Sequence, residues 1–469
     1  MDGFNLELLN RLPLAEATWT LFRFAANDAV LEEIFEQNRG RAYSSQLTFS
    51  TLVDLLGNAL LVHGGSGRQS FAEGREKGAL TVTDQAAYGK LRRIPVAVSE
   101  AFLSEVAARL TAVASPGETR SLPEWFADYQ VVTIDGKKVK KLAKRLKPLR
   151  GVSGSLLGGK VLAAIDGRTG LVIALSSALD GEANDAPLVP TLVPQVRSRV
   201  VGPRLWLADR QFCDLTIPWL LSEQGDGFVI RHCLKLKFHR DCSREVRESR
   251  DAENRLIREE WGWVGSANDQ RRMYVRRVTL ERPDEEPILV LTNLLDGDRF
   301  PAEALLELYG ERWHIERVFQ QVTEVSQLQA LIGSTPQAAI LQASLCFVLY
   351  NVIQVIRGYV ARAHEVSPER VSAELLFRDV QKQMTCWTEL GTPPLPERVS
   401  ETPTEADATR RRLTELLRGV WSDRWRKSPP KKSWKPTAQT QAVAGGHSSA
   451  WKLLERARSA KLQRPGAGG

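Results

Sequence analysis

Cysteine is scarce in this chain: only five occur among 469 residues, and five is an odd number. So few cysteines exclude a disulfide-stapled secreted scaffold and predict free thiols in a reducing compartment. The first residues, Met1 to Phe4, contain no basic segment that leads into an apolar run, so we expect no signal peptide. Both absences predict a cytoplasmic protein.

Long hydrophobic runs are nearly missing as well. The uncharged stretch of membrane-spanning length is residues 338–356, and Gln342, Ser344, Asn351 and Gln354 interrupt it. Polar side chains are costly inside a bilayer and are rare there. We therefore expect a helix buried inside the protein rather than a membrane span.

The excess of positive charge is modest overall but locally concentrated. The chain has 64 Lys and Arg against 56 Asp and Glu, a net charge of +8 and a pI near 9.2. Residues 137–150 hold eight basic residues and no acidic one, and a second basic segment follows Trp421. Clustered positive charge suits a polyanion, so nucleic acid is the expected partner. Four lysines of the first segment are the expected phosphate contacts: Lys140, Lys141, Lys144 and Lys147.

Changes in the spacing of apolar residues, and in the secondary structure that this spacing predicts, divide the chain into five parts. Apolar residues follow helical spacing before the first strand pattern, which begins near Val131. Three strands, a helix, a strand, a helix and a strand then follow, which predicts a mixed α/β sheet with flanking helices. The predicted parts are a helical region that is either a DNA-binding module or a plain bundle (1–125), the mixed α/β domain (126–233 and 296–360), a β-rich insertion (234–295), a helical C-terminal region (361–420) and a basic, loosely ordered tail (421–469).

Two aspartates end predicted strands. Asp135 closes the run 131–134, and Asp209 closes the run 204–208. A carboxylate at such a place is costly to bury unless it is paired or binds a metal, although Asp after a strand is more often part of a turn. Mg²⁺ prefers carboxylate oxygens, and two such ions can promote phosphodiester cleavage.

A third carboxylate lies on a helix predicted from Pro301 to about Leu331. Tyr309, Arg312 and Glu316 lie at positions i, i+3 and i+7, so they share one helix face. The planar guanidinium of Arg312 suits phosphate. The simpler interpretation of this motif alone is a solvated helix with an Arg–Glu pair.

Together these motifs resemble the DDE transposases of bacterial insertion sequences, in the branch called insertion sequence four. Its signature is Tyr-x2-Arg-x3-Glu-x6-Lys, and this chain has Thr323 at the position of the lysine. The resemblance covers roughly residues 130–355. The other matching motifs are Ile134–Gly136, Asp166–Gly170, Ala208–Phe212 and the Leu-Thr-Asn strand at 291–293.

The resemblance implies an RNase H-like catalytic domain in which Asp135, Asp209 and Glu316 are the catalytic, metal-binding residues. It further implies two Mg²⁺ or Mn²⁺ ions, and DNA contacts by Tyr309 and Arg312. The implied activity is cut-and-paste cleavage and transfer of DNA strands at the terminal inverted repeats of an insertion sequence. Region 1–125 would bind the DNA ends, and the protein would act as a homodimer on transposon-end and target DNA at the bacterial nucleoid.

Several other interpretations stay open at this point. A catalytically impaired or domesticated transposase would bind DNA without cutting, and a glycosidase would use paired carboxylates without a metal. Residues 154–161 nearly form a phosphate-binding loop but end in Val161 instead of Ser or Thr. Trp261 and Trp263 could stack on a flipped base or pack in a core. Four residues whose spacing fits no common zinc pattern are His232, Cys233, His239 and Cys242.

Overall fold

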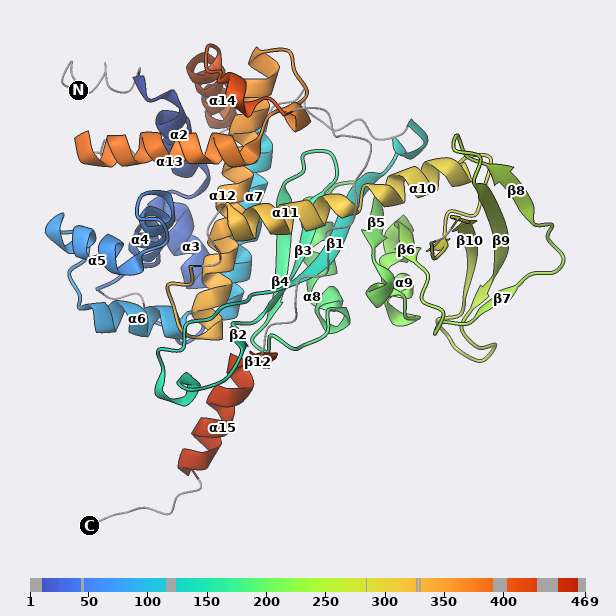
Figure 1. Cartoon of the computed structure of the whole chain (residues 1–469), viewed down its shortest axis with the longest axis horizontal. Coiled ribbons are helices and arrows are strands. Elements are labelled where there is room, and N and C mark those ends of the chain that lie inside the picture. Colours follow the sequence, from blue (N-terminus) through green and yellow to red (C-terminus); the bar gives the residue numbers. More distant parts are fainter. Residues whose placement is uncertain are drawn as a thin grey trace.

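A central sheet joins a helical body to a β-rich lobe in the computed structural model (Figure 1). The element order is helices, then a mixed α/β region, then helices, which confirms the predicted mixed α/β class with flanking helices. The structure describes residues 11–43, 46–114, 124–283, 285–325, 328, 330–390, 403–427 and 446–462.

Five strands form the part of the sheet that carries the candidate site, in the order β4-β3-β1-β5-β6. The pairs β4–β3 and β3–β1 are antiparallel, whereas β1–β5 and β5–β6 are parallel. All five strands were predicted from the sequence, and the structure confirms them. They are β1 (Gln130–Lys138), β3 (Lys160–Asp166), β4 (Val172–Ala178), β5 (Arg204–Ala208) and β6 (Gly227–Arg231).

Both faces of this sheet are covered. Strand β5 is buried along its whole length, as expected for a parallel strand inside a sheet with two covered faces. Val131 of β1 packs in a core with α10 (Ala302–Gly310), while its neighbour Val132 belongs to a second core that includes residues of α8 (Val189–Arg199). Successive residues of β1 therefore alternate between the α10 side and the α8 side.

The β-rich insertion extends the same sheet instead of forming a separate one. Strand β11 pairs with β6, and β10, β9 and β7 follow in order, so that the described part of the chain contains a ten-stranded sheet with β8 paired to β9. The insertion strands are β7 (Phe238–Arg240), β8 (Arg247–Arg250), β9 (Leu256–Val264), β10 (Met273–Leu280) and β11 (Ile288–Thr292).

The N-terminal helices pack against helices from the C-terminal half. Side chains at their N-caps, such as Thr48 and Thr83, accept hydrogen bonds from backbone N–H groups of the first turn. Gln383 accepts hydrogen bonds from the backbone of Leu14 and Ala15, at 2.8 and 3.2 Å. The helices are α2 (Pro13–Ala25), α3 (Asp28–Asn38), α4 (Phe49–Leu61), α5 (Gly67–Glu76), α6 (Asp84–Arg93), α7 (Val96–Val113), α13 (Ala373–Leu390) and α14 (Pro403–Leu417).

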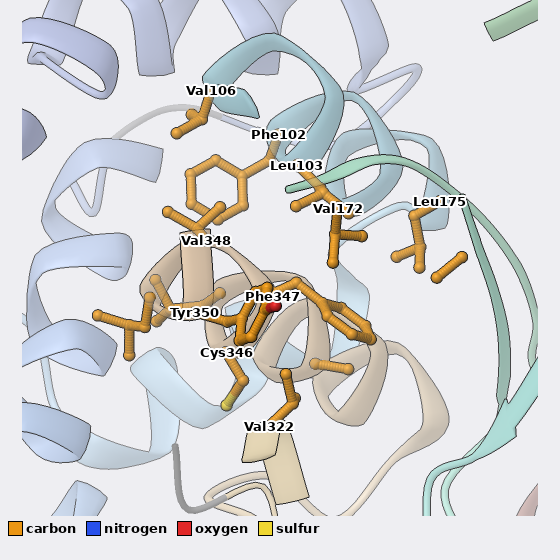
Figure 2. Close-up of a cluster of buried hydrophobic side chains, with 14 of the residues drawn as sticks. Phe102, Leu103, Val106, Val172, Leu175, Val322, Cys346, Phe347, Val348 and Tyr350 are labelled. Atoms are coloured by element: carbon orange, nitrogen blue, oxygen red, sulfur yellow. The ribbon is translucent and has the colours of Figure 1, made fainter. Parts of the chain in front are cut away.

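Helix α12 (Pro336–Ala363) forms the centre of the helical body. Figure 2 shows Phe347, Val348 and Tyr350 of α12 among side chains of α7, β4 and α11 (Trp313–Glu324). Length and hydropathy alone would allow α12 to cross a membrane, but 94% of its most apolar window is buried inside the protein. The predicted buried helix is therefore confirmed.

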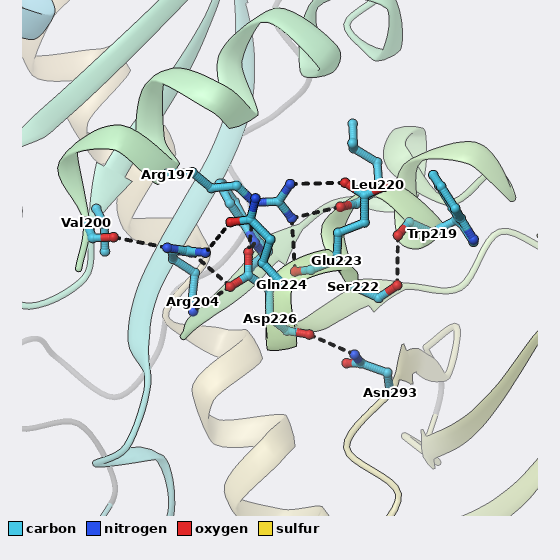
Figure 3. Close-up of polar contacts among 11 residues, drawn as sticks. Arg197, Val200, Arg204, Trp219, Leu220, Ser222, Glu223, Gln224, Asp226 and Asn293 are labelled. Atoms are coloured by element: carbon cyan, nitrogen blue, oxygen red, sulfur yellow. Dashed lines mark hydrogen bonds and ion pairs between the residues drawn. The ribbon is translucent and has the colours of Figure 1, made fainter. Parts of the chain in front are cut away.

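A buried carboxylate anchors the beginning of β5. Asp226 accepts hydrogen bonds from Arg197, Arg204 and Trp206, and Asn293 donates to its backbone oxygen (Figure 3). The Asn293 side chain also accepts from the backbone N–H of Phe228 at 2.9 Å, so it ties β6 to the end of the insertion. This network fixes the end of the sheet that lies away from Asp209.

The C-terminal segment returns to the mixed α/β region. Strand β12 (His447–Ser449) pairs with β2 (Ser155–Leu157), and helix α15 (Ala450–Leu462) follows and packs against the short turn at 147–149. Residues 428–445 and 463–469 of the predicted loosely ordered tail lie outside the described residues.

Candidate active site

Asp135 and Asp209 occupy equivalent positions on two neighbouring parallel strands. The register of β1 and β5 pairs Thr133 with Leu207, and two further residues bring Asp135 level with Asp209. Neighbouring strands lie about 4.8 Å apart, and side chains two residues apart share a face. Both aspartates therefore lie at the carboxyl edge of the parallel strands, on the α10 side.

Local backbone hydrogen bonds orient both carboxylates. Asp135 Oδ1 accepts from the backbone N–H of Gly136 at 2.8 Å. Asp209 is the N-cap of the short turn η4 (Arg210–Phe212), where its Oδ1 accepts from the N–H of Gln211 at 2.7 Å. Within the described residues, no hydrogen bond reaches Oδ2 of Asp209. Each aspartate thus uses one oxygen for a nearby backbone N–H group, and the second oxygen of Asp135 faces Arg312.

The helix predicted from Pro301 to Leu331 is interrupted at the signature motif. Helix α10 ends at Gly310 and α11 begins at Trp313. The prediction of one continuous helix is therefore wrong, although Glu311 and Arg312 keep helical backbone angles. The backbone N–H groups at the junction bond three residues back instead of four, as in His314 to Glu311 at 2.9 Å. Tyr309, Arg312 and Glu316 consequently stay on one side of the helix pair.

Arg312 connects the helix to the strand carboxylates. Its Nη1 lies 3.5 Å from Asp135 Oδ2, and its Nη2 lies 3.3 Å from Glu316 Oε1. The Arg312 side chain is 8% exposed, whereas that of Glu316 is 41% exposed. The structure therefore brings Asp135, Arg312 and Glu316 into direct contact, with Asp209 close enough to influence the charge state of Asp135.

The candidate site carries an excess of buried negative charge. The pKa of Asp135 is raised to about 7, mainly by burial and also by the charges of Asp209 and Glu316, while the Gly136 N–H and Arg312 act in the opposite direction. A group whose charge is this poorly compensated favours a bound cation. Closely spaced oxygen donors of this kind suit Mg²⁺ or Mn²⁺.

A complete three-carboxylate cluster is not formed as the side chains stand. Within the residues that the structure describes, no three His, Cys, Asp or Glu side chains lie close enough together to hold an ion. At this site the reason is Arg312, because its guanidinium pairs with both Asp135 and Glu316. The Asp135–Asp209 pair fits a divalent cation, and the participation of Glu316 stays a prediction.

Tyr309 lies beneath this cluster and not at the surface. The residue is 6% exposed, and its buried hydroxyl makes no well-formed hydrogen bond within the described part of the chain. Burial raises the pKa of the Tyr309 phenol, and the nearby charges of Arg312 and Arg231 oppose this shift. The predicted contact between Tyr309 and DNA would require the hydroxyl to become accessible.

Thr323, at the position of the signature lysine, directs its hydroxyl inward. Its Oγ1 donates to the backbone oxygen of Phe319 at 2.6 Å, within the same helix. Positive charge reaches this part of α11 from another element: Lys137 Nζ of β1 lies 5.7 Å from the centre of the Phe319 ring. Burial and Lys140 lower the pKa of Lys137, whereas Asp135, Glu324 and Glu316 oppose this shift.

The four predicted phosphate-binding lysines are all exposed. They lie on the segment that follows β1, which ends at Lys138. Lys144 also donates a hydrogen bond to the backbone oxygen of Val152. The C-terminal helix α15 packs against this same segment near Lys147, so both basic segments recognised in the sequence meet here.

Asp185 is a buried group beside the site that the sequence motifs did not identify. It is 3% exposed and forms an ion pair of 2.9 Å with Lys160. Its carboxylate packs directly against Gly136, on the α8 side of β1. The Lys160 side chain therefore pairs with Asp185, which argues against a phosphate-binding role for the loop 154–161.

Packing and side-chain contacts bear on two other sequence hypotheses. Trp261 is 1% exposed, its Nε1 donates to the Leu295 oxygen, and it packs in the insertion. Trp263 is only half-buried, with Tyr274 against its ring at 5.0 Å. The His and Cys residues near 232–242 do not form a metal-binding group in the described part of the chain.

The segment that carries this site matches a known protein family. Residues 127–352 match the family model described as "Transposase DDE domain". A stretch of 81 residues is 32% identical to "Putative transposase y4zB" of Sinorhizobium fredii (strain NBRC 101917 / NGR234), which is 17% of this chain and 22% of that protein. The match thus spans about a fifth of the curated relative. A solved piggyBac transposase synaptic complex with hairpin DNA gives a TM-score of 0.42 at 13% identity, over 88% of each chain.

The segment that matches the transposase DDE domain contains the whole candidate site, because Asp135, Asp209 and Glu316 all lie inside it. The more particular assignment, to the branch with the Tyr-Arg-Glu-Lys signature, stays a prediction.

Proposed function

We propose that this protein is a DDE transposase that binds the terminal inverted repeats of an insertion sequence and carries out metal-dependent DNA strand cleavage and transfer. The observation that supports this proposal most directly is the placement of Asp135 and Asp209 on adjacent parallel strands, with Arg312 and Glu316 above them. That arrangement lies within the segment that matches a transposase DDE domain.

In this proposal Asp135, Asp209 and Glu316 hold one or two Mg²⁺ or Mn²⁺ ions. Such ions, when bound, activate the attacking oxygen and stabilise the leaving oxygen of a phosphodiester. The three carboxylates can approach one another only if the guanidinium of Arg312 leaves its present ion pairs. A DNA phosphate is a suitable competitor, because the planar guanidinium binds phosphate through two parallel hydrogen bonds. Arg312 would thus link DNA binding to the assembly of the carboxylates.

The remaining predicted contacts surround this centre. The exposed lysines beyond β1 would hold DNA phosphates near the carboxylates, and the helices before residue 125 would bind the DNA ends. A homodimer would bring two ends together in the DNA complex. Lys137 would supply positive charge where Thr323 replaces the signature lysine.

A direct test uses the DNA ends that flank the gene of this protein. Purified protein is incubated with these ends in the presence and absence of Mg²⁺, and the products are resolved by denaturing electrophoresis. We expect strand breaks at the boundary of the inverted repeat that depend on Mg²⁺ and disappear in a chelator. Cleavage that persists in the chelator would contradict the proposal, and so would a failure to bind the ends.

One observation favours a second candidate, a catalytically impaired transposase that binds DNA without cutting. The hydroxyl of Thr323 is used within its own helix and carries no charge. In the same experiment, this candidate predicts specific binding to the ends without any strand breaks. Restoration of cleavage by Thr323→Lys would identify the substitution as the cause.

A further inference from the structure

A cavity of about 700 Å³ opens at the carboxyl edge of the sheet, beside Asp209. Its walls come from three loops: residues 184–186 before α8, 210–215 after β5, and 233–236 after β6. Strands β4, β5 and β6 run in the same direction as β1, so the segments that follow them meet at one edge. Ligands of open α/β sheets bind at this edge, where the direction of the strand order reverses. We call this cavity the strand-edge pocket.

Four polar side chains of the strand-edge pocket are free to bind a ligand. Asn184, Arg210, Gln211 and Lys235 are exposed, and their side chains make no hydrogen bond or ion pair with any residue that the structure describes. Two are amides, each of which offers both a donor and an acceptor, and two are cations. This combination can recognise the edge of a base and the charge of a phosphate at once.

The two acidic residues of the strand-edge pocket are already engaged with the protein. Asp185 pairs with Lys160, and Asp214 accepts a hydrogen bond from the backbone N–H of Ile217 at 2.8 Å. The uncommitted charge of the pocket is therefore positive, which favours an anionic ligand.

Apolar groups complete the walls. Leu215 and Leu236 line the strand-edge pocket together with Cys213. Burial raises the pKa of the Cys213 thiol to about 12, so the thiol is neutral at physiological pH. A volume of several hundred cubic ångströms with apolar walls and a few polar groups is typical of sites for small organic ligands, and a nucleobase presents both an apolar face and a polar edge.

We propose that the strand-edge pocket binds one unstacked nucleotide of the DNA strand that passes over Asp209. The base would lie between the apolar walls with its edge toward Asn184 and Gln211, and the phosphates would contact Arg210 and Lys235. This inference rests on the proposed function, because it takes DNA as the substrate of the neighbouring carboxylates.

The position of the strand-edge pocket fits a DNA strand that passes over Asp209. Asp185, which lines it, packs against Gly136 on the α8 side of β1, whereas Asp135 lies on the opposite side. Arg210 and Gln211 directly follow Asp209 in the chain. A DNA strand that crosses the edge of the sheet would place one phosphate at the carboxylates and a nearby base in the pocket.

The test compares two oligonucleotides of about 16 nucleotides, within the range of single-strand site sizes. One carries normal bases in mixed sequence, and the other has the same backbone with abasic residues at its central positions. Binding to the full-length protein is measured by fluorescence anisotropy with a chelator present, so that no cleavage occurs. A third oligonucleotide with 5-iodouracil at these positions is photocrosslinked to the protein, and the attached peptides are identified by mass spectrometry.

The double variant Asn184→Ala/Gln211→Ala should bind the normal oligonucleotide at least about fivefold more weakly, the lower bound for loss of a base-edge contact. Its affinity for the abasic oligonucleotide should equal that of the parent. Arg210→Ala/Lys235→Ala should weaken binding to both oligonucleotides. The matched control is Asn268→Ala/Gln270→Ala, the same exposed residue types in a turn of the insertion, which should leave both affinities unchanged.

Crosslinks to residues 210–215 or 233–236 are the expected direct signal. Equal loss of affinity for both oligonucleotides in the amide variant, or crosslinks confined to other segments, would overturn the nucleotide pocket while leaving the proposed function intact. A parent protein that binds neither these oligonucleotides nor its own DNA ends would contradict the proposed function itself.

Discussion

The carboxylate of Asp185 fills the space that a side chain at position 136 would need. A Cβ atom built on Gly136 would lie 1.9 Å from Asp185 Oδ1, far inside van der Waals contact. The glycine directly follows Asp135, and Asp185 is held in place by Lys160. The position of one predicted metal ligand therefore depends on a buried ion pair on the other side of its strand.

Replacement of this glycine should affect both stability and activity. Gly136→Ala must displace the buried Asp185 carboxylate, so we expect the free energy of unfolding to fall by about 1–3 kcal/mol and DNA cleavage to fall with it. Urea unfolding and the end-cleavage assay measure the two effects. Gly57→Ala is the matched control, because a Cβ atom at Gly57 in α4 meets nothing within 4 Å. This control should be neutral or slightly stabilising, and similar behaviour of the two variants would refute the steric argument.

The three carboxylates can be tested without relying on activity alone. Mg²⁺ that binds only the folded state should stabilise the parent by about 2.7 kcal/mol at a hundredfold excess over its Kd. Asp135→Asn, Asp209→Asn and Glu316→Gln should each abolish cleavage and leave end binding largely intact. The first two should also lose the Mg²⁺-dependent rise in Tm. Near-normal cleavage by any one variant would remove that residue from the catalytic set.

Arg312 should lower the affinity of the site for Mg²⁺ and raise the binding or cleavage of DNA ends. Arg312→Ala removes the cation that pairs with Asp135 and Glu316, so Mg²⁺ should bind more tightly while end binding or cleavage weakens. Titration by calorimetry and the cleavage assay separate the two effects. Arg312→Lys keeps the charge but loses the planar fork, and it should restore the parent affinity for Mg²⁺ but not full cleavage. An Arg312→Ala variant that is fully active on its ends would exclude the proposed role.

The exposed lysines beyond β1 should supply affinity that does not depend on sequence. Changing Lys140, Lys141, Lys144 and Lys147 to Ala should weaken binding about equally for end DNA and random DNA. The slope of log affinity against log salt should flatten by up to roughly 0.9 per lost phosphate contact. The control changes four exposed basic residues on helix α13, on helix α14 and in the turn directly after α14 (Figure 1), namely Arg378, Lys382, Arg411 and Arg418. An unchanged salt slope in the first variant would assign the electrostatic role to another segment.

The sequence predicted most of the sheet because its strands have simple local signals. The run before Asp135 and the hairpin around Asp166–Gly170 both read as strands bounded by turn residues, and the structure confirms them. The approach of Asp135 to Asp209 followed from the expected strand order. The interruption at Glu311 could not be foreseen, because a change from four-residue to three-residue hydrogen bonding leaves the apolar spacing unaltered.

Features that depend on distant contacts were not predictable in the same way. No sequence motif singled out Asp185, and only the fold brings Lys160 to it and places it behind Gly136. Likewise, Arg312 was expected beside Glu316, but its second ion pair with Asp135 depends on how α11 lies over β1. Local periodicity specifies elements, whereas the electrostatic balance of a site depends on their packing.

The dependence of the first helices on the last ones has a consequence during synthesis. Three side chains from the C-terminal half form hydrogen bonds with the backbone of the N-terminal helices. Gln383 accepts from the N–H of Leu14, Gln381 donates to the oxygen of Leu60, and Tyr359 donates to the oxygen of Val113. A nascent chain therefore cannot complete this core until roughly 300 further residues have been made, on the order of 15–60 s at about 5–20 residues per second. During that time we expect the apolar faces of α2 to α7 to stay exposed and to require protection by chaperones. Chains that terminate early should be degraded as unfolded protein instead of persisting as fragments that compete for DNA.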